Sequence, residues 1–113
     1  MSRFLYHMAR QSEWEQAEAE GLYRGSADDR RDGFMHFSTD EQVAESAAKH
    51  RAGQTDLLLI VVAEEGTGPW KWEESRGGAL FPHLYGPLPV TAAVGVHELP
   101  LGPDGLHVFP PFV

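Results

Sequence analysis

The chain alternates between short apolar runs and polar stretches, and the period of that alternation predicts its elements. Leu57 to Ala63 is an apolar run of seven residues, typical of a strand buried on both faces and too short to span a membrane. Further strands are expected at residues 4–8, 34–37, 70–73, 90–99 and 106–109. Apolar residues at every second position, including Val94 and Val96, make 90–99 a half-buried strand. Pro82 makes residues 80–85 an edge strand or an irregular segment, because proline cannot donate a backbone hydrogen bond.

Capping patterns predict the first of two helices. Ser12 precedes Glu15 by three residues, which is a capping box, and the helix is expected over residues 13–20. Gly21 is the expected left-handed residue at its end. Residues 28–33 are charged and finish in Asp-Gly, which predicts a polar loop ending in a turn.

A second pair of capping patterns predicts the second helix. Ser38 precedes Glu41 by three residues and Thr39 precedes Gln42 by three. The helix is expected over residues 39–51.

The order of elements is strand, helix, strand, helix and then β-rich sequence, which indicates the α+β class. We expect antiparallel sheets packed against two helices, with Leu57–Val62 as a central strand. The 113 residues are expected to form a single domain, residues 1–113.

The net charge of the chain limits which classes of molecule it is expected to bind. Nine Lys and Arg against seventeen Asp and Glu give a net charge of −8, which disfavours nucleic acid and acidic membrane surfaces as partners. A small anionic ligand remains compatible, because a local pocket can oppose the net charge. The chain has no cysteine and begins without an apolar signal segment, so a cytoplasmic location is expected.

Familiar catalytic and metal-binding motifs are absent from the sequence. It contains no G-x-S-x-G, no phosphate-binding P-loop and no G-x-G-x-x-G. His7, His36 and His83 with Glu73 could in principle surround a metal, but none lies in a local ligand pair such as H-x-x-x-H. We therefore expect no metal site and no dependence on metal ions.

Residues 32–39, D-G-F-M-H-F-S-T, carry the first candidate site. Strand alternation places Phe34, His36 and Ser38 on one face, just before a predicted helix N-terminus that favours anions. The alternative is that His36 is a core histidine with satisfied hydrogen bonds and that Ser38 and Thr39 only cap the helix.

Residues 80–89, L-F-P-H-L-Y-G-P-L-P, carry the second candidate site. His83 and Tyr85 alternate onto one face of a backbone stiffened by prolines, an arrangement suited to holding a small ligand. The alternative is a proline-rich edge connection packed by Phe81 and Tyr85.

Glu73 beside Trp72 is the third candidate. A carboxyl group in apolar surroundings can have a raised pKa and act as acid, base or cation stabiliser, whereas the alternative is a solvated strand residue. We predict that His36, Ser38, His83 and Tyr85 line one cleft with Glu73 at its wall. The His36 and His83 rings should then lie within about 10 Å of each other, one small-ligand diameter.

These segments together resemble a bacterial and plant family, that of domain of unknown function 952. The resemblance rests on the blocks at 32–39 and 80–89, Gln42, the 57–62 strand after Asp56, and W-E at 72–73. It runs from about Phe4 to Leu99 with matching order and spacing, and it includes Trp14. Met35 stands where the family commonly has isoleucine, which exchanges one apolar residue for another.

The resemblance implies a fold similar to that of ADP-ribosyltransferases, an α+β structure with split antiparallel sheets. Enzymes of that fold bind NAD between the sheets and break its bond to nicotinamide through an oxocarbenium-like transition state. That chemistry uses a histidine or arginine at the ribose, an aromatic ring near nicotinamide and commonly a glutamate near the developing cation. The candidates assigned to these parts by their chemistry are Glu73, His36 and His83 as catalytic residues and His7, Ser38, Thr39 and Tyr85 as binding residues.

Two classes of function stay open. The first is an NAD-dependent glycosyl or ADP-ribosyl transferase or hydrolase, with NAD as substrate rather than as a resident cofactor. The second is a non-catalytic domain that binds a small molecule in the same pocket. Related folds include an RNA 2′-phosphotransferase, but the charge of −8 disfavours a polynucleotide substrate.

Overall fold

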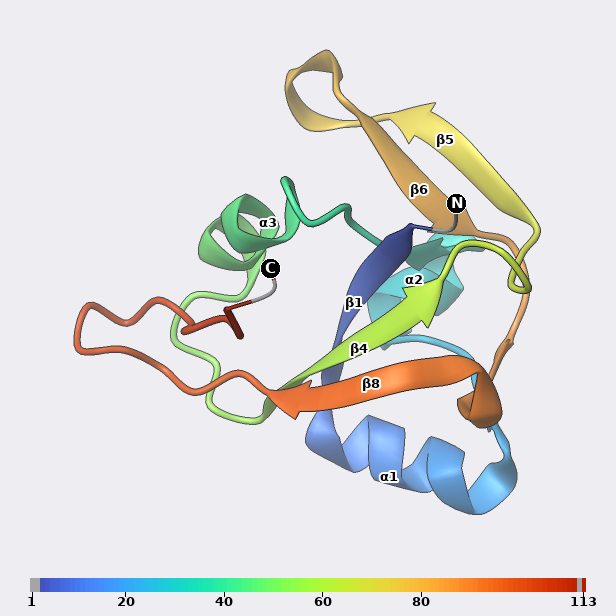
Figure 1. Ribbon diagram of the computed structural model, residues 1–113, viewed down its shortest axis with the longest axis horizontal. Helices are drawn as coiled ribbons and strands as arrows, with labels where there is room; N and C mark the ends of the chain where they lie inside the picture. Colours follow the sequence, from blue (N-terminus) through green and yellow to red (C-terminus); the bar gives the residue numbers. More distant parts are fainter. Residues whose placement is uncertain (1–2, 112) are drawn as a thin grey trace.

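The computed structural model describes residues 3–111 and 113, without the side chain of residue 76. Eight strands and three α-helices follow one another in these residues (Figure 1). In chain order they are β1 (Phe4–Arg10), α1 (Gln11–Glu20), β2 (Leu22–Tyr23), α2 (Ala27–Asp32), β3 (Met35–His36), α3 (Val43–His50), β4 (Leu57–Ala63), β5 (Trp70–Glu74), β6 (Leu80–Leu84), β7 (Leu88–Pro89) and β8 (Ala93–Glu98). Short 3-10 turns occupy Arg76–Gly78 and Val90–Ala92.

The strands form antiparallel sheets, which confirms the α+β class. One sheet has the order β1-β4-β8, a second has the order β3-β6-β5, and β2 pairs with β7. The predicted central strand is confirmed, since β4 lies between β1 and β8 and its residues from Leu57 to Val62 are buried. A continuous apolar run suits this position because both of its faces are covered.

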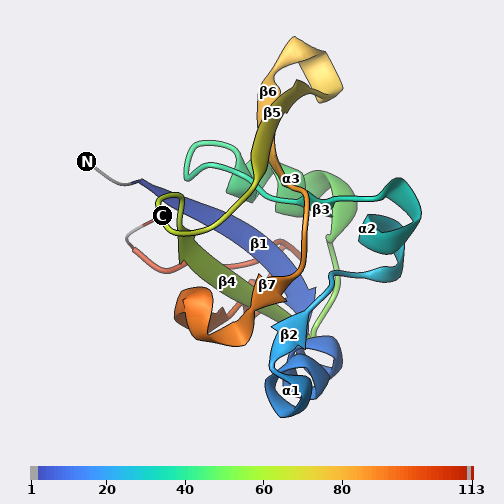
Figure 2. The same ribbon diagram turned by 90° about the vertical axis from the view of Figure 1, so that its right-hand side faces the viewer.

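The β5–β6 hairpin projects from the rest of the protein, and α1 lies at the opposite end (Figures 1 and 2). The two larger sheets are joined where the chain leaves β3. There Tyr6 and Ser38 exchange backbone hydrogen bonds of 2.9 and 2.8 Å. This junction brings β1, β3 and β6 together.

The expectation that residues 80–85 form an edge or irregular segment is wrong, because β6 is the middle strand of its sheet. Pro82 is tolerated in this central strand because it lies opposite the end of β3, where the pairing between β3 and β6 stops. The Phe37 N–H donates to the Pro82 carbonyl at 3.1 Å, and the return bond that proline cannot make would fall at the end of this ladder.

The described residues form three α-helices where two were expected. The additional helix is α2, which replaces the expected polar loop over 28–33. Its first turn is closed by a capping box, in which Ser26 Oγ accepts from the Asp29 N–H at 3.2 Å and Asp29 Oδ2 accepts from the Ser26 N–H at 2.8 Å. This local bonding stabilises a helix of six residues.

The expected capping boxes of the other two helices are absent. Helix α1 starts at Gln11, so Ser12 already lies inside it, although Gly21 ends it in the left-handed conformation as predicted. Helix α3 starts at Val43, not at residue 39, because Ser38 is still bonded to β1 as extended chain. Only half of the second box forms, where Gln42 Oε1 accepts from the Thr39 N–H at 3.0 Å.

The C-terminal part departs from expectation as well. Residues 90–92 form a 3-10 turn, and β8 exposes Val94 and Val96 instead of burying them. Residues 106–109 do not form a strand, and only an isolated bridge joins Leu101 to His107.

Two apolar clusters fill the two faces of the β1-β4-β8 sheet. The larger one includes Leu5, Trp14 and Ile60 and extends to the β3-β6-β5 sheet, whereas the smaller one includes Val43, Leu59 and Leu99 and lies under α3. Among the described residues, no helix is both long enough and apolar enough to cross a membrane.

Candidate functional site

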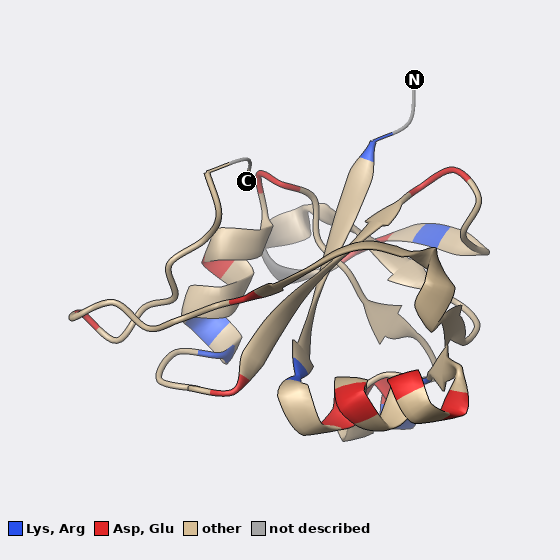
Figure 3. Ribbon diagram, turned by 60° about the horizontal axis from the view of Figure 1, so that its bottom comes forward, with Lys and Arg blue, Asp and Glu red and all other residues tan. Residues whose placement is uncertain are grey.

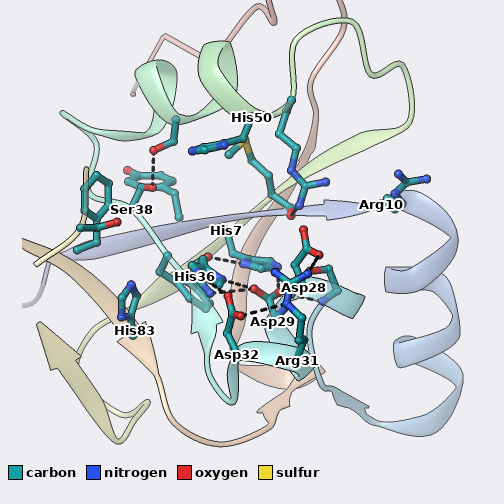
Figure 4. Close-up of a pocket in the computed structure, with 18 of the residues that line it drawn as sticks. His7, Arg10, Asp28, Asp29, Arg31, Asp32, His36, Ser38, His50 and His83 are labelled. Carbon is teal, nitrogen blue, oxygen red and sulfur yellow. Dashed lines mark hydrogen bonds and ion pairs between the residues drawn. The ribbon is translucent and has the colours of Figure 1, made fainter. Parts of the chain in front are cut away.

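A polar cleft of about 560 Å³ lies at the junction of the two larger sheets (Figure 4). Its walls come from β1, α2, β3, α3 and the β5–β6 hairpin. The side chains that line it include His7, His36, His50 and His83, the arginines Arg10, Arg31 and Arg51, and Asp28, Asp29 and Asp32. Its volume is within the range of small-molecule sites.

Asp29 is the buried centre of this cleft, with 4% of its surface exposed. Its Oδ1 accepts from His36 Nδ1 at 2.5 Å and from the His36 N–H at 3.2 Å. Gly25 makes its close packing possible, since an added Cβ there would lie 2.6 Å from the Asp29 Cβ. Burial opposes ionisation of Asp29, but the His36 hydrogen bond and the nearby His7 hold the pKa of this carboxyl well below its usual range.

His36 is held between two carboxylates. Its Nδ1 faces Asp29, and its Nε2 lies 3.3 Å from Asp32 Oδ2. Because carboxylates only accept hydrogen bonds, both ring nitrogens are protonated donors in this arrangement. The Asp29 hydrogen bond raises the pKa of His36 above its ordinary value, although partial burial opposes the shift.

His7 has the opposite protonation state. It is 3% exposed, and burial lowers its pKa despite the Asp29 carboxylate 3.8 Å away. Nδ1 lies 2.7 Å from the His36 carbonyl, so this nitrogen carries the proton, and Nε2 accepts from the Tyr23 hydroxyl at 2.7 Å. Burial also disfavours the charged form of Tyr23 and so raises its pKa, and the hydroxyl therefore keeps its proton and acts as the donor.

A second cluster lies beside the first. Glu73 Oε1 accepts from His83 Nδ1 at 2.8 Å and from the Tyr85 hydroxyl at 2.7 Å. These two hydrogen bonds lower the pKa of Glu73, and the same contact raises the pKa of Tyr85. The Phe34 ring stacks on His83 with centroids 4.2 Å apart.

The predicted meeting of the two segments is confirmed. The rings of His36 and His83 lie 5.4 Å apart, and these residues are paired in the β3–β6 ladder. The sequence argument placed Tyr85 and Glu73 in the same cleft, but neither is among the described residues that line it. Glu73 accepts from His83 Nδ1, and the Tyr85 hydroxyl donates to Glu73.

The remaining sequence candidates are less central. Ser38 lines the cleft but is buried, and its hydroxyl lies 3.4 Å from that of Ser46. Thr39 does not line the cleft in the described part of the chain. Its N–H donates to Gln42 Oε1, and its carbonyl accepts from the N–H groups of Gln42 and Val43. The role of each candidate in binding or catalysis remains a prediction.

Sequence reasoning missed Asp29 and the arginines of the cleft. The signal for Asp29 was the S-x-x-D spacing from Ser26, which marks a helix start, but it says nothing of His36 or His7. The Arg51 guanidinium donates to Gln54 Oε1 at 3.1 Å and to the Met8 carbonyl at 3.4 Å. No local sequence motif predicts these contacts. Among the described residues, no group of three or more His, Asp or Glu side chains is arranged to hold a metal ion.

The fold and this cleft define an α+β protein with a polar pocket at the junction of two antiparallel sheets. The chain belongs to the family described as protein of unknown function DUF952, whose family model matches residues 8–96. This confirms the resemblance seen in the sequence.

Solved structures of protein CC0527 from Caulobacter crescentus are similar to the chain. Its crystal structure is 45% identical with a TM-score of 0.89, and the match covers 93% of each chain. The solution NMR structure of CC0527 is 46% identical with a TM-score of 0.82, and the match covers 91% of this chain and 90% of that one. A search of curated proteins gives no match.

Proposed function

We propose that the cleft binds a small phosphate-bearing ligand of the nucleotide class, with NAD as the first candidate. The observation that carries this proposal is the gathering of Arg10, Arg31 and Arg51 around one cleft in a protein of net charge −8. Acidic residues are concentrated on α1 (Figure 3), and none of the residues of α1 lines the cleft. Guanidinium groups favour phosphate because their N–H donors match its oxygens in pairs.

The three arginines are not equally available to a ligand. Arg31 is paired with Asp28 at 3.2 Å and with Asp32 at 3.3 Å. Arg51 is oriented by Gln54 and Met8 and retains further N–H donors. Arg10 and Arg51 are therefore the proposed phosphate contacts.

The position of the cleft supports a further part of the proposal, that this is a variant of the ADP-ribosyltransferase-like architecture. Two three-stranded antiparallel sheets meet at Tyr6 and Ser38, and the cleft opens at that junction. In such a site the enzyme would transfer or hydrolyse the glycosyl group of NAD. Glu73 would act through His83, since it bonds His83 rather than facing the cleft.

A specific observation favours a second candidate, a binding domain that breaks no bond. Both ring nitrogens of His7 and both of His36 are engaged by other groups of the protein. Groups engaged in this way hold the shape of a site, and neither histidine has a free ring nitrogen with which to take a proton from a ligand.

One experiment tests both candidates. Calorimetric titration with NAD and with ADP-ribose is expected to show binding that is weakened at least several-fold by Arg10→Met. The matched control is Arg30→Met, an exposed arginine outside this cleft, which should leave binding unchanged. Release of nicotinamide from NAD would support the enzyme, and binding without release would support the binding domain. Absence of binding by either compound would overturn the nucleotide proposal.

A further inference from the structure

His83 differs from the other two histidines at the junction of the sheets. It is 6% exposed, lines the cleft and lies opposite His36 in the β3–β6 ladder. Its Nδ1 is engaged by Glu73, which is not among the described residues that line the cleft. By contrast, protein groups engage both nitrogens of His7 and both of His36.

The bond to Glu73 decides which nitrogen of His83 carries the proton. An ionised carboxylate can only accept, so Nδ1 must be the N–H donor across this distance of 2.8 Å. In the neutral ring Nε2 is then left with a lone pair. A histidine held in this tautomer by a carboxylate can accept a hydrogen bond or a proton from a hydroxyl group.

Packing around His83 limits how far the ring, and with it that lone pair, can turn. Phe34 stacks on the His83 ring at an interplanar angle of 21°, which restricts rotation of the ring. The Tyr85 hydroxyl donates to the same Glu73 oxygen at 2.7 Å and so holds the carboxylate in place. Lys71 lies over the Tyr85 ring at 4.6 Å and completes this support.

We propose that His83 is the hydroxyl-recognising end of the cleft, with Glu73 as its positioning residue. Nε2 accepts a hydrogen bond from a sugar-type hydroxyl of the ligand. If the proton transfers, the electron pair stays on the hydroxyl oxygen, and the resulting imidazolium is neutralised by Glu73. The ligand class is therefore a phosphorylated sugar or nucleotide with free hydroxyls, and this part rests on the proposed function.

The tautomer can be measured without any ligand. Long-range ¹H–¹⁵N NMR of the full chain, at a pH where the His83 ring is neutral, should show Nδ1 protonated and Nε2 bare. Glu73→Gln keeps an acceptor oxygen and should retain this tautomer, whereas Glu73→Met should give a mixture. Glu74→Met, a change in the exposed neighbouring glutamate, is the control and should match the wild type. A mixture or the opposite tautomer in the wild type would overturn the inference.

Chemical labelling tests the direction of the lone pair and the ligand class. Diethyl pyrocarbonate attacks unprotonated ring nitrogens, and peptide mass spectrometry should show faster labelling at His83 than at His7 or His36. ADP-ribose should slow labelling of His83 several-fold, whereas inorganic phosphate at the same concentration should not. Equal protection by phosphate would overturn the hydroxyl role, as would calorimetric binding of ADP-ribose without protection.

Failure of the nucleotide proposal has a separate signature. In that case neither probe binds in calorimetry, and the ligand class named here falls with it. The NMR tautomer and the labelling rates then still decide whether His83 presents an unprotonated Nε2 to the cleft.

Discussion

At the scale of single residues, Asp29 connects most of the polar contacts of the cleft. It accepts hydrogen bonds from the Ser26 N–H, the His36 N–H and the His36 ring. Burying a carboxylate is unfavourable unless its oxygens are bonded, and these three donors supply that compensation. One side chain thereby fixes the start of α2 and the orientation of His36.

Replacing Asp29 should therefore be costly. Asp29→Asn removes the charge opposite the protonated His36 and leaves buried donors poorly matched, so we expect a loss of about 3 kcal/mol in the free energy of unfolding. Asp28→Asn is the control, because Asp28 is largely exposed and its loss should cost no more than about 0.5 kcal/mol. Urea denaturation measures both, and equal effects would show that Asp29 is not the centre of the cleft.

His36 and His7 should make opposite contributions to the pH dependence of stability. The pKa of His36 is raised from 6.5, so its contribution is complete below that value and is lost as the pH rises through the folded pKa. The pKa of His7 is lowered from 6.5, so its contribution is present above that value and is lost as the pH falls through the folded pKa. The two effects partly cancel in the wild type.

Replacing His36 should remove its part of the pH dependence of the unfolding free energy. In His36→Gln the difference in unfolding free energy from the wild type should be larger at about pH 5.5 than at about pH 8.5, since only the protonated ring gains from Asp29. Chemical denaturation at the two pH values measures this difference. A difference that stays constant with pH would show that His36 gains no proton on folding.

Residue positions in the site were partly predictable. Strand alternation placed each of His36 and His83 on one face of its own strand, and the separate inference that the two segments meet is confirmed by the pairing of β3 with β6. Asp29 could not be found in this way, since its partners lie on β3 and β1 and are set by packing. Glu73 and Tyr85 do lie beside His83, but in the described residues they do not line the cleft as predicted.

At the scale of elements, local capping chemistry decides whether a short helix forms. Helix α2 has six residues, too few to be stable from propensity alone. Its capping box forms because Asp29 is also held by His36 from the other side. The similar pattern at Ser12 has no such tertiary support and forms no cap.

A pair of serine substitutions tests this contrast. Ser26→Ala removes the acceptor of the Asp29 N–H and should cost about 1 kcal/mol. Ser12→Ala should cost much less, because Ser12 is exposed inside α1 and alanine is a good helix former. Thermal and urea unfolding of both variants measure the difference, and a larger loss for Ser12→Ala would contradict the helix start at Gln11.

Elements set by continuous local patterns were predictable, and elements set by distant partners were not. The apolar run of β4 predicts a buried strand, and the glycine after α1 predicts the end of that helix. Whether β6 is central or at an edge depends on β3, which pairs with only two of its residues. The exposure of Val94 and Val96 depends on what covers their face of β8 in the folded protein, which alternation does not reveal.

At the scale of the whole molecule, the bridge between Tyr6 and Ser38 holds the two larger sheets at one junction. Gln42 adds a second tie, since its Nε2 donates to the Leu80 carbonyl at 2.8 Å and joins the start of α3 to the hairpin. The cleft therefore lies between parts of the chain that are far apart in sequence but linked on two sides. Its shape is a property of the assembled fold rather than of any one segment.

The folded protein as a whole is expected to be stable without metal ions. Protein groups engage both ring nitrogens of His7 and of His36 and one ring nitrogen of His83, so a metal ion that used more than one of these histidines would have to displace existing partners. A resident ion that binds only the folded state would raise its stability in proportion to the logarithm of ion concentration over dissociation constant. We expect the melting temperature of the full chain to be the same in EDTA as in buffer, measured by differential scanning calorimetry.

Addition of zinc after EDTA treatment should likewise leave the melting temperature unchanged. A loss of several degrees in EDTA that zinc restores would show that these histidines hold a metal, and His36→Gln and His83→Gln would then identify which of them is a ligand.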